Sequence, residues 1–369
     1  MSTNRSTIVT MFFNIRPQDT TTNLSMPYKT TDFYFELANT FILRLPHPLI
    51  IFMDELDKKT EEFVVHVRQS CGMINKTHIF KLAIQDTYFY KDIERIKFLM
   101  ESFVITNSNQ DKDTALYVVT TNNKMDFMER AIELNPFQSS HFLWMDFGIN
   151  HVAKDVELID TWFPHIPDKI KQLCINPYLE DTPPKEYFQL IYHNCAGGLF
   201  SGSVENLLKY SSLFKQKTAD IYQQGWYQLD EAVMTIVQRE NPDLFDLFYG
   251  DYEGIISNYT TPKHSWWLIS TGMRKCLSHN NTRFLFQILK YLEPYFSLSL
   301  NRLKPEFYEY LNNCFICEYY QNNQQLRSNT IQFINEAIER KDPNIQLLLT
   351  HNLNNLNYYT NKHLINYEQ

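Results

Sequence analysis

Acidic residues follow two short apolar segments of this sequence, at the points where strands would end. Asp146 comes directly after residues 142–145, and the pair Asp54-Glu55 comes after residues 49–53. An acidic side chain at the carboxyl end of a strand can hydrogen-bond the ribose of a nucleotide, or bind a divalent cation that neutralises its phosphates. The alternatives are structural: Asp146 could cap the turn that follows it, and Asp54-Glu55 could form a solvated turn.

The elements around these residues follow the pattern of an α/β protein. Short β-branched and aromatic segments alternate with longer segments of helical periodicity, which predicts βαβ units and a largely parallel sheet. The segments expected as strands are 7–13, 49–53, 79–84, 115–119 and 142–145. The segments expected as helices between them are 32–43, 60–71, 91–102 and 125–134. After about Gly272 the pattern becomes helical, and the tail from His351 is rich in Asn and Tyr.

Ligands of such a sheet bind beyond the carboxyl ends of its strands, where polar groups of this sequence collect. The residues expected there are 14–16, 54–55, 120–124 and 146–148. Glycine adds a further signal, because the chain has only nine glycines and three of them are Gly197, Gly198 and Gly202. Such a cluster predicts either a close approach of backbone to ligand or a tight turn from a strand into the helix expected at 204–214.

Two common phosphate-binding plans are missing from the sequence. A dinucleotide-binding site requires glycines in the turn after the first strand, but the corresponding turn of this sequence contains none. The chain also has no Gly-Lys pair, which a P-loop requires. Dehydrogenases and P-loop kinases are therefore disfavoured. A nucleotide bound by this sheet would more readily be held through a metal ion on a strand-end carboxylate.

Composition narrows the class of protein further. The 369 residues are 44% hydrophobic and carry a net charge of -8 without a basic run, so we expect a globular protein that does not bind nucleic acid. The first ten residues lack the parts of a signal peptide, and the apolar runs are shorter than the roughly 20 residues of a membrane span. Six cysteines without regular spacing favour buried thiols in a reducing, cytoplasmic environment.

A family resemblance emerges from the order of several segments. Residues 7–15, 48–55 and 135–137, followed by Phe142-Leu143-Trp144-Met145-Asp146-Phe147-Gly148, resemble the WlaTC/HtrL group of bacterial glycosyltransferase-like proteins. The similarity extends from about residue 7 to about 295. It implies a GT-A-like fold, a mostly parallel sheet flanked by helices, with a helical C-terminal extension. It also implies transfer of a sugar from a nucleotide-sugar, a UDP-sugar by analogy, to a glycan or another hydroxyl acceptor.

The resemblance also implies roles for individual residues. GT-A enzymes usually hold Mn²⁺ or Mg²⁺ with an Asp-x-Asp motif, but the second Asp is Gly148 here, as it is in the resembled family. The metal ligands expected are Asp146 and His264, although a histidine beside Trp266-Trp267 is more often packed or on the surface. The residues expected to contact the donor are Phe13, Asn14, Arg16, Asp54, Lys124, Asp146, Gly148, Gly197 and Gly198. Lys124 could also be a solvated loop lysine.

An inverting transferase needs a base, because a sugar hydroxyl is too weakly acidic to attack unaided. Asp230-Glu231 is the pair expected to supply it, after the aromatic residues Trp226 and Tyr227. Structural roles compete, since Asp230 suits a helix N-cap and Glu231 the positive end of a helix dipole. Cys314 and Cys317 have zinc-like spacing, but without a second ligand pair they are better explained as packed helix cysteines.

The resemblance suggests three parts of the chain. Residues 1–155 would bind the nucleotide-sugar, residues 156–272 would complete the same domain on the acceptor side, and residues 273–369 would form a helical region with a polar tail. A non-catalytic binding or assembly module on the same fold is the alternative function, since the second motif carboxylate is missing. A nucleotidyltransferase is less favoured because the first turn lacks a Gly-rich, basic loop.

Overall fold

The computed structural model describes residues 5–15, 30–109, 111–178, 182–263, 268–279 and 281–297. The chain divides into two compact units. The first unit comprises residues 1–176 and 181–260, and the second comprises residues 177–180 and 261–369. Arg16 and His264 lie outside the described residues, as do the helices expected at 307–320 and 330–340 and the pair Cys314 and Cys317.

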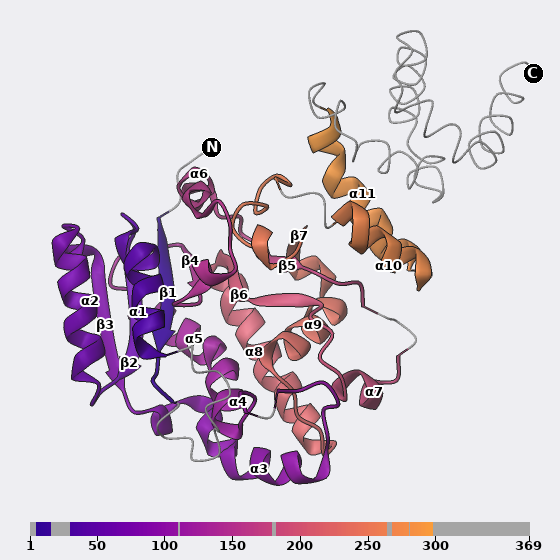
Figure 1. Ribbon diagram of the computed structural model, residues 1–369, viewed down its shortest axis with the longest axis horizontal. Helices are drawn as coiled ribbons and strands as arrows, with labels where there is room; N and C mark the ends of the chain where they lie inside the picture. The colour runs from indigo at the N-terminus through magenta and orange to yellow at the C-terminus, as the bar shows by residue number, and fades with distance from the viewer. Residues whose placement is uncertain are drawn as a thin grey trace, which may run out of the picture. The chain divides into compact units, whose positions relative to one another are not determined.

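The first unit is built on one mostly parallel sheet (Figure 1). Its seven strands have the order β3-β2-β1-β4-β6-β5-β7. Strands β3, β2, β1 and β4 are parallel to one another, β6 is antiparallel to β4 and β5, and β5 and β7 are parallel. The bounds are β1 (Ser6–Phe12), β2 (Leu49–Asp54), β3 (Thr77–Leu82), β4 (His141–Met145), β5 (Ile170–Cys174), β6 (Cys195–Ser203) and β7 (Phe245–Tyr249). The expected α/β class is confirmed.

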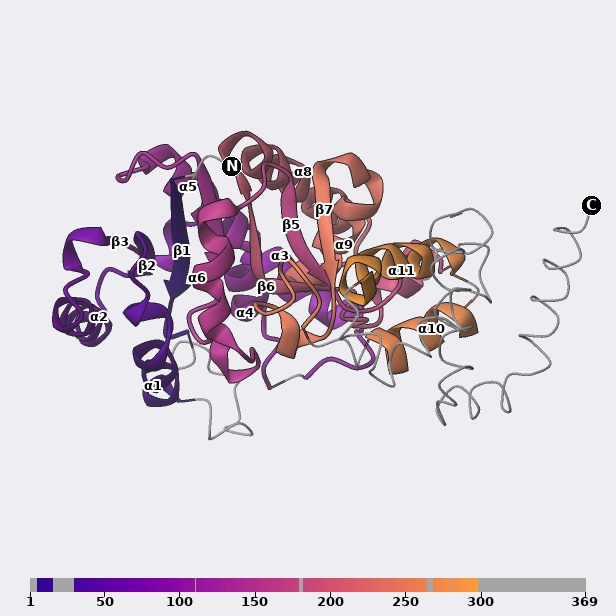
Figure 2. The same cartoon turned by 90° about the horizontal axis from the view of Figure 1, so that it is seen from above.

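Helices cover both faces of this sheet. On one face α5 contacts β1 and β4, α8 contacts β4, β5 and β6, and α9 contacts β6. Figure 2 shows α1 on the opposite side, where Phe35 packs on Phe12 of β1 with ring centroids 5.7 Å apart. The helices of the first unit are α1 (Thr31–Thr40), α2 (Lys58–Ser70), α3 (Ile93–Ser102), α4 (Ala115–Asn122), α5 (Lys124–Leu134), α6 (Ile159–Trp162), α7 (Pro184–Phe188), α8 (Val204–Gln223) and α9 (Asp230–Glu240).

Burial on both faces explains why the central strands are continuously apolar rather than alternating. All five residues of β4 are buried, as are residues 49–53 of β2. Trp144 of β4 is fully buried and stacks between Phe127 of α5 and Phe200 of β6, with ring centroids 6.4 and 6.1 Å apart. This stack fixes α5 against the centre of the sheet.

One expected strand is wrong. Residues 115–119 form the start of helix α4, which begins after Thr114, whose hydroxyl accepts a hydrogen bond from the Tyr117 N–H. A five-residue apolar run cannot be distinguished by periodicity from a buried helix segment, and here the capping threonine decides. The other four expected strands coincide with β1 to β4, whereas β5, β6 and β7 were not predicted from the sequence.

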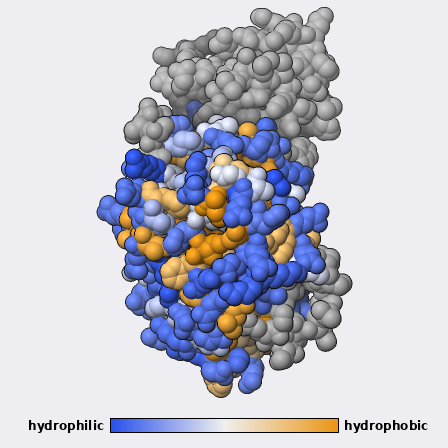
Figure 3. Space-filling view, turned by 90° about the vertical axis from the view of Figure 1, so that its left-hand side faces the viewer, coloured by the Kyte–Doolittle hydropathy of each residue, from blue (hydrophilic) through white to orange (hydrophobic). Residues whose placement is uncertain are grey.

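The surface of the described residues is mixed in polarity. The face drawn in Figure 3 is mostly hydrophilic, with hydrophobic residues gathered near its middle. Among the described helices, none is both long and apolar enough to cross a bilayer. In the second unit, α10 (Met273–Ser278) and α11 (Thr282–Ser297) follow a short π-helix at Leu268–Gly272, and α11 includes the helical segment expected at 284–292.

Candidate active site

A cavity of about 370 Å³ lies at the carboxyl ends of β1 and β4. Residues 11–15 and 146–148 follow these two strands into it, and Tyr34 of α1 and Tyr117 of α4 add aromatic rings. The remaining lining residues are Thr31, Asp111, Lys112, Thr114, Thr120, Thr121, Lys124, His151, His193, Leu229, Asp230, Glu231 and Tyr252. The site therefore lies where an open α/β sheet is expected to bind its ligand.

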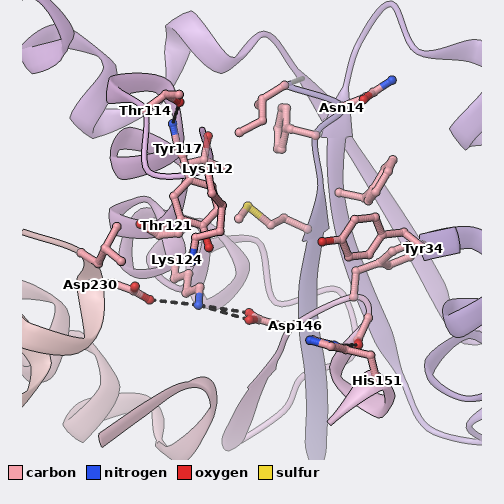
Figure 4. A pocket seen from close by; sticks show the side chains of 18 of the residues that line it. Asn14, Tyr34, Lys112, Thr114, Tyr117, Thr121, Lys124, Asp146, His151 and Asp230 are labelled. Carbon is pink, nitrogen blue, oxygen red and sulfur yellow. Dashed lines mark hydrogen bonds and ion pairs between the residues drawn. The ribbon is translucent and has the colours of Figure 1, made fainter. Parts of the chain in front are cut away.

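A buried ammonium group joins two carboxylates in this cavity. Lys124 Nζ lies 2.9 Å from Asp230 Oδ2, and 3.2 and 3.3 Å from the two oxygens of Asp146 (Figure 4). It also donates to the Gly197 carbonyl oxygen at 3.0 Å. Through the ion pair with Asp230 and its contacts with Asp146 and Gly197, Lys124 links both carboxylates to strand β6. The alternative that Lys124 is a solvated loop lysine is therefore wrong.

Burial and charge set the protonation states of this cluster. Burial alone would lower the pKa of Lys124, but the negative charges of Asp146 and Asp230 outweigh it, and the pKa is raised above its ordinary value. Burial raises the pKa of Asp230 to about 6, with Lys124 opposing that increase and Glu231 adding to it. Asp230 therefore takes up a proton as the pH falls through about 6.

Local structure explains why Lys124 reaches this position. It is the first residue of α5, which follows α4 after Asn123 alone. The fully buried Asn123 side chain accepts from the Phe89 N–H at 3.0 Å and donates to Thr87 Oγ1 at 2.8 Å, so the junction of the two helices is fixed. Phe127, one turn further along α5, stacks on Trp144 and orients the helix toward β4.

Asp146 is held from three sides. Trp144 Nε1 donates to its Oδ1 at 2.8 Å, Lys124 lies against both of its oxygens, and its backbone N–H donates to the Gly198 carbonyl oxygen at 2.9 Å. Its side chain keeps 40% of its surface exposed, so one side still faces the cavity.

Gly148 occupies the position of the missing second aspartate, and the structure gives a steric reason for glycine there. A Cβ atom at this residue would lie 2.8 Å from Tyr34 Cδ1 and 3.2 Å from Leu37 Cδ1. Both values are closer than ordinary van der Waals contact. A carboxylate side chain at position 148 would therefore require the Tyr34 ring to shift.

Of the two alternatives left open for the glycine cluster, the turn is wrong, because Gly197, Gly198 and Gly202 all lie within strand β6. A Cβ atom on Gly197 would lie 2.6 Å from Asp230 Oδ2, whereas one on Gly198 would be in ordinary contact, 3.5 Å from Asp146 Oδ2. The close approach is therefore between Gly197 of strand β6 and the carboxylate of Asp230. Asp230 is also not the N-cap of α9; that position is Leu229, and Asp230 is the first helical residue.

A second hydrogen-bonded group surrounds Glu231. The Tyr252 hydroxyl donates to its two oxygens at 3.0 and 2.9 Å, the Gly197 N–H donates at 2.9 Å, and His193 Nδ1 lies 3.3 Å from Oε2. Burial acts to raise the pKa of Glu231, but the hydrogen bonds from His193 and Gly197 outweigh it and the pKa is lowered. Burial and the Glu231 charge raise the pKa of Tyr252, which keeps its proton.

The structure brings most of the expected site residues together. Those that line the cavity are Phe13, Asn14, Lys124, Asp146, Gly148, Asp230 and Glu231. Gly197 and Gly198 contact this group through their backbone atoms. Asp54 is not among the lining residues; its Oδ1 accepts from the Leu56 N–H at 2.9 Å, in the turn that was its structural alternative.

Sequence reasoning missed several lining residues. These are Tyr34, Lys112, Tyr117, His151, His193 and Tyr252. None of them follows an expected strand, and His193 and Tyr252 meet Glu231 only through tertiary contacts. Tyr117 was assigned to a strand, so its place in the cavity wall could not be foreseen.

The described residues do not by themselves form a divalent metal site. Within the described ranges, no three His, Cys, Asp or Glu side chains are grouped to share an ion. Asp146 is the exposed carboxylate of the Lys124 cluster, and both of its oxygens already lie within 3.3 Å of an ammonium group. A metal ion there would meet a positive charge at close range.

Comparison with known proteins supports the resemblance seen in the sequence. A family model described as "Bacterial protein of unknown function (HtrL_YibB)" matches residues 4–260. Protein HtrL of Escherichia coli (strain K12) is 24% identical over 258 residues, covering 66% of this chain and 87% of that protein. The apo crystal structure of mouse xyloside xylosyltransferase 1 is 12% identical, with a TM-score of 0.33 over 66% of this chain and 84% of that one. That TM-score is too low to bear on fold or function.

Proposed function

The chain belongs to the HtrL_YibB family of bacterial proteins, and we propose that it is a glycosyltransferase that moves a sugar from a nucleoside-diphosphate sugar to a hydroxyl acceptor. The observation that carries the proposal is the Asp146–Lys124–Asp230 cluster, placed inside a cavity at the strand ends of a mostly parallel sheet. Cavities at this edge are the usual ligand sites of such sheets. The glycosyltransferase-like character of the resembled group supports the assignment.

The lining offers a surface suited to each part of such a donor. Aromatic rings of Phe13, Tyr34 and Tyr117 can pack against a nucleoside base or a sugar face. Lys112 is a further cation of the wall, 3.2 Å from Asp113 and with 30% of its side chain exposed. Because negative charge grows on the departing diphosphate, we assign Lys112 and the Lys124 ammonium to its electrostatic stabilisation.

The two carboxylates expected as bases take different roles in this proposal. Asp230 forms an ion pair with Lys124, and only 5% of its side chain is exposed. We therefore assign Asp230 to positioning the ammonium group. Glu231 keeps 21% of its side chain exposed and lies on the cavity wall, so we assign it to the acceptor side of the reaction. An Mn²⁺ or Mg²⁺ ion, which the family resemblance implies, would have to arrive with the donor diphosphate.

Thermal stabilisation by ligands tests the proposal. Purified protein should be stabilised by at least one of UDP, GDP, ADP, CDP or dTDP, each measured with and without Mn²⁺, because a ligand of the native state raises stability by RT ln(1 + [L]/Kd). The corresponding nucleotide-sugar should then be hydrolysed or transferred. Absence of both binding and turnover across the panel, with and without metal, would contradict the assignment.

Asp146→Asn gives the sharper variant. The amide oxygen still accepts from Trp144 Nε1, so we expect the melting temperature to stay close to that of the wild type while turnover falls by at least tenfold. Asp146→Ala is less informative because it leaves the buried indole N–H without its acceptor. Undiminished turnover in Asp146→Asn would show that the strand-end carboxylate has no part in the reaction.

A non-catalytic nucleotide-sugar-binding module is the second candidate. It is favoured by one observation: Asp146 stands without a second motif carboxylate, and its oxygens are engaged by Lys124 and Trp144. Stabilisation by a nucleotide-sugar without hydrolysis or transfer would support this candidate. Turnover of the donor would eliminate it.

A further inference from the structure

His193 on the cavity wall forms a hydrogen-bonded group with Glu231 and Tyr252. Its Nδ1 lies 3.3 Å from Glu231 Oε2 and 3.1 Å from the Tyr252 hydroxyl oxygen. The imidazole is 53% exposed, whereas the glutamate is 21% exposed. A histidine that is open on one side and held by a carboxylate on the other has the arrangement of an oriented general base.

Counting protons identifies which ring nitrogen is free. The single proton of the Tyr252 hydroxyl is donated to Glu231, and an ionised carboxylate can only accept. Nδ1 must therefore carry the proton that bridges His193 to Glu231 Oε2. In the neutral ring Nε2 is then the unprotonated nitrogen, and within the described part of the chain it has no hydrogen-bond partner.

The backbone of His193 is held in an uncommon conformation. Its φ of +48° lies in the left-handed region, which few residues other than glycine adopt. The Asn176 side chain maintains this conformation by donating to the carbonyl oxygens of Tyr192 and His193, both at 3.0 Å. The Ile175 N–H donates to the Asn194 carbonyl oxygen at 2.7 Å. Strain that the surroundings maintain is characteristic of functional sites.

We propose that His193 Nε2 is the general base that takes the proton from the acceptor hydroxyl, and that Glu231 and Tyr252 position its ring. The inference rests on the proposed glycosyltransferase function. As the hydroxyl oxygen forms its bond to the anomeric carbon, its proton passes to Nε2. The bond from the anomeric carbon to the phosphate oxygen breaks, and the nucleoside diphosphate leaves with the electron pair. The imidazolium then returns its proton to solvent. This single displacement inverts the anomeric configuration.

The charged groups around His193 set the expected pH dependence. Glu231 of α9 and Tyr252 of the 3₁₀ turn at Tyr252–Gly254 contact the ring directly, and the ion pair of Lys124 and Asp230 lies in the same cavity. A protonated imidazole cannot accept a proton, so kcat/KM should fall on the acid side of its profile. The negative charge of Glu231 stabilises the imidazolium that forms during transfer.

His193→Gly with added imidazole is the decisive experiment. Glycine adopts the positive φ at no steric cost, so the variant should fold and should still be stabilised by the donor nucleotide that binds the wild type. We expect kcat/KM to fall by about 10²–10⁴, the range of general-base catalysis, and to recover in part with imidazole. Glu231→Gln should also lose activity, but imidazole should not restore it, because the ring of His193 is still present. His66→Gln, at an exposed histidine of α2, is the matched control and should respond to imidazole as the wild type does.

The outcomes separate the two proposals. A wild-type protein that neither binds nor turns over any donor overturns the glycosyltransferase assignment. If the wild type is active, three results overturn the role of His193 alone: turnover by His193→Gly within about threefold of the wild type, an unchanged acid limb in that variant, or a product with retained anomeric configuration. Inversion together with imidazole rescue supports it.

Discussion

Removing the ammonium group of Lys124 should destabilise the protein in a way that depends on pH. Lys124→Met keeps the length of the side chain and its helix propensity but leaves Asp230 buried without a counter-charge. The side chains of the pair are 7% and 5% exposed, so water cannot replace the lost interaction. Asp146 is 40% exposed, and its loss of Lys124 is partly compensated by solvent.

The magnitude follows from the burial of the pair. Breaking a buried ion pair by removing one partner costs about 3–5 kcal/mol, which we expect at pH 7.5. The pKa of Asp230 is raised from its ordinary value of 3.8 to about 6 while Lys124 is present, and it should rise further once Lys124 is removed. A group whose pKa is raised in the folded state contributes to the stability of the fold. This contribution is fully present below the unfolded-state pKa and is lost as the pH rises through the folded-state pKa.

In the wild type, Asp230 stops lowering the stability of the fold as the pH rises past about 6, because its carboxyl is ionised above that pH. In Lys124→Met the carboxyl stays protonated to higher pH, so the stability continues to fall as the pH rises above 6. Between pH 6 and pH 7.5, about 1.5 pH units at ~1.4 kcal/mol each add about 2 kcal/mol to the cost of the substitution. The difference in stability should therefore be about 2 kcal/mol smaller at pH 6 than at pH 7.5.

Urea unfolding of the wild type and variant at both pH values measures this difference. Lys97→Met is the matched control, because Lys97 pairs with Glu94 at 2.7 Å on the surface, where the side chains are 54% and 80% exposed. It should cost no more than about 0.5 kcal/mol at either pH. In a double-mutant cycle, Asp230→Asn should recover part of the loss. The reasoning is refuted if Lys124→Met costs no more than the control, or costs the same at both pH values.

Two further predictions concern the same cluster. Gly197→Ala should cost about 1–3 kcal/mol in the free energy of urea unfolding, because its Cβ would lie 2.6 Å from Asp230 Oδ2. Gly198→Ala, whose Cβ has ordinary contacts, should cost less than about 1 kcal/mol; equal costs would contradict the close approach at Gly197. The affinity for a nucleoside diphosphate should rise as the pH falls through about 6, because protonation of Asp230 removes a negative charge near the bound anion. Calorimetric titration at pH 7.5 and 5.5 measures the change, and Asp230→Asn should remove it; the same dependence in that variant would show that another group is responsible.

The sequence predicted the elements that depend on local pattern and missed those that depend on tertiary contact. Strands β1 to β4 are apolar runs bounded by turn residues, and they were predicted within a few residues of their bounds. Strand β6 contains Gly197, Gly198 and Gly202, which read locally as a turn. Its first glycine is explained by a carboxylate of α9, far away in sequence, so no local rule could identify it.

The same distinction applies to the site. Asp146 and Lys124 were selected because they were expected to follow strands, yet Lys124 in fact follows a helix and reaches the cavity through the buried junction at Asn123. Lys124 lines the cavity, but for a different reason from the one that the sequence suggested. His193 carried no signal in the sequence, because its function depends on a positive φ and on Glu231, 38 residues away.

The glycine of the Asp-x-Gly motif is explained by side-chain packing around position 148 rather than by the loss of a metal ligand. The Tyr34 ring fills the space in which a side chain at position 148 would stand, so Gly148 is required by the cavity wall itself. The remaining carboxylate, Asp146, is not left uncompensated, because Lys124 supplies a permanent positive charge within 3.3 Å. Restoring the second carboxylate would therefore displace Tyr34 and add negative charge beside an already balanced pair. If a divalent cation takes part, its binding must depend on the donor's oxygens far more than on this motif.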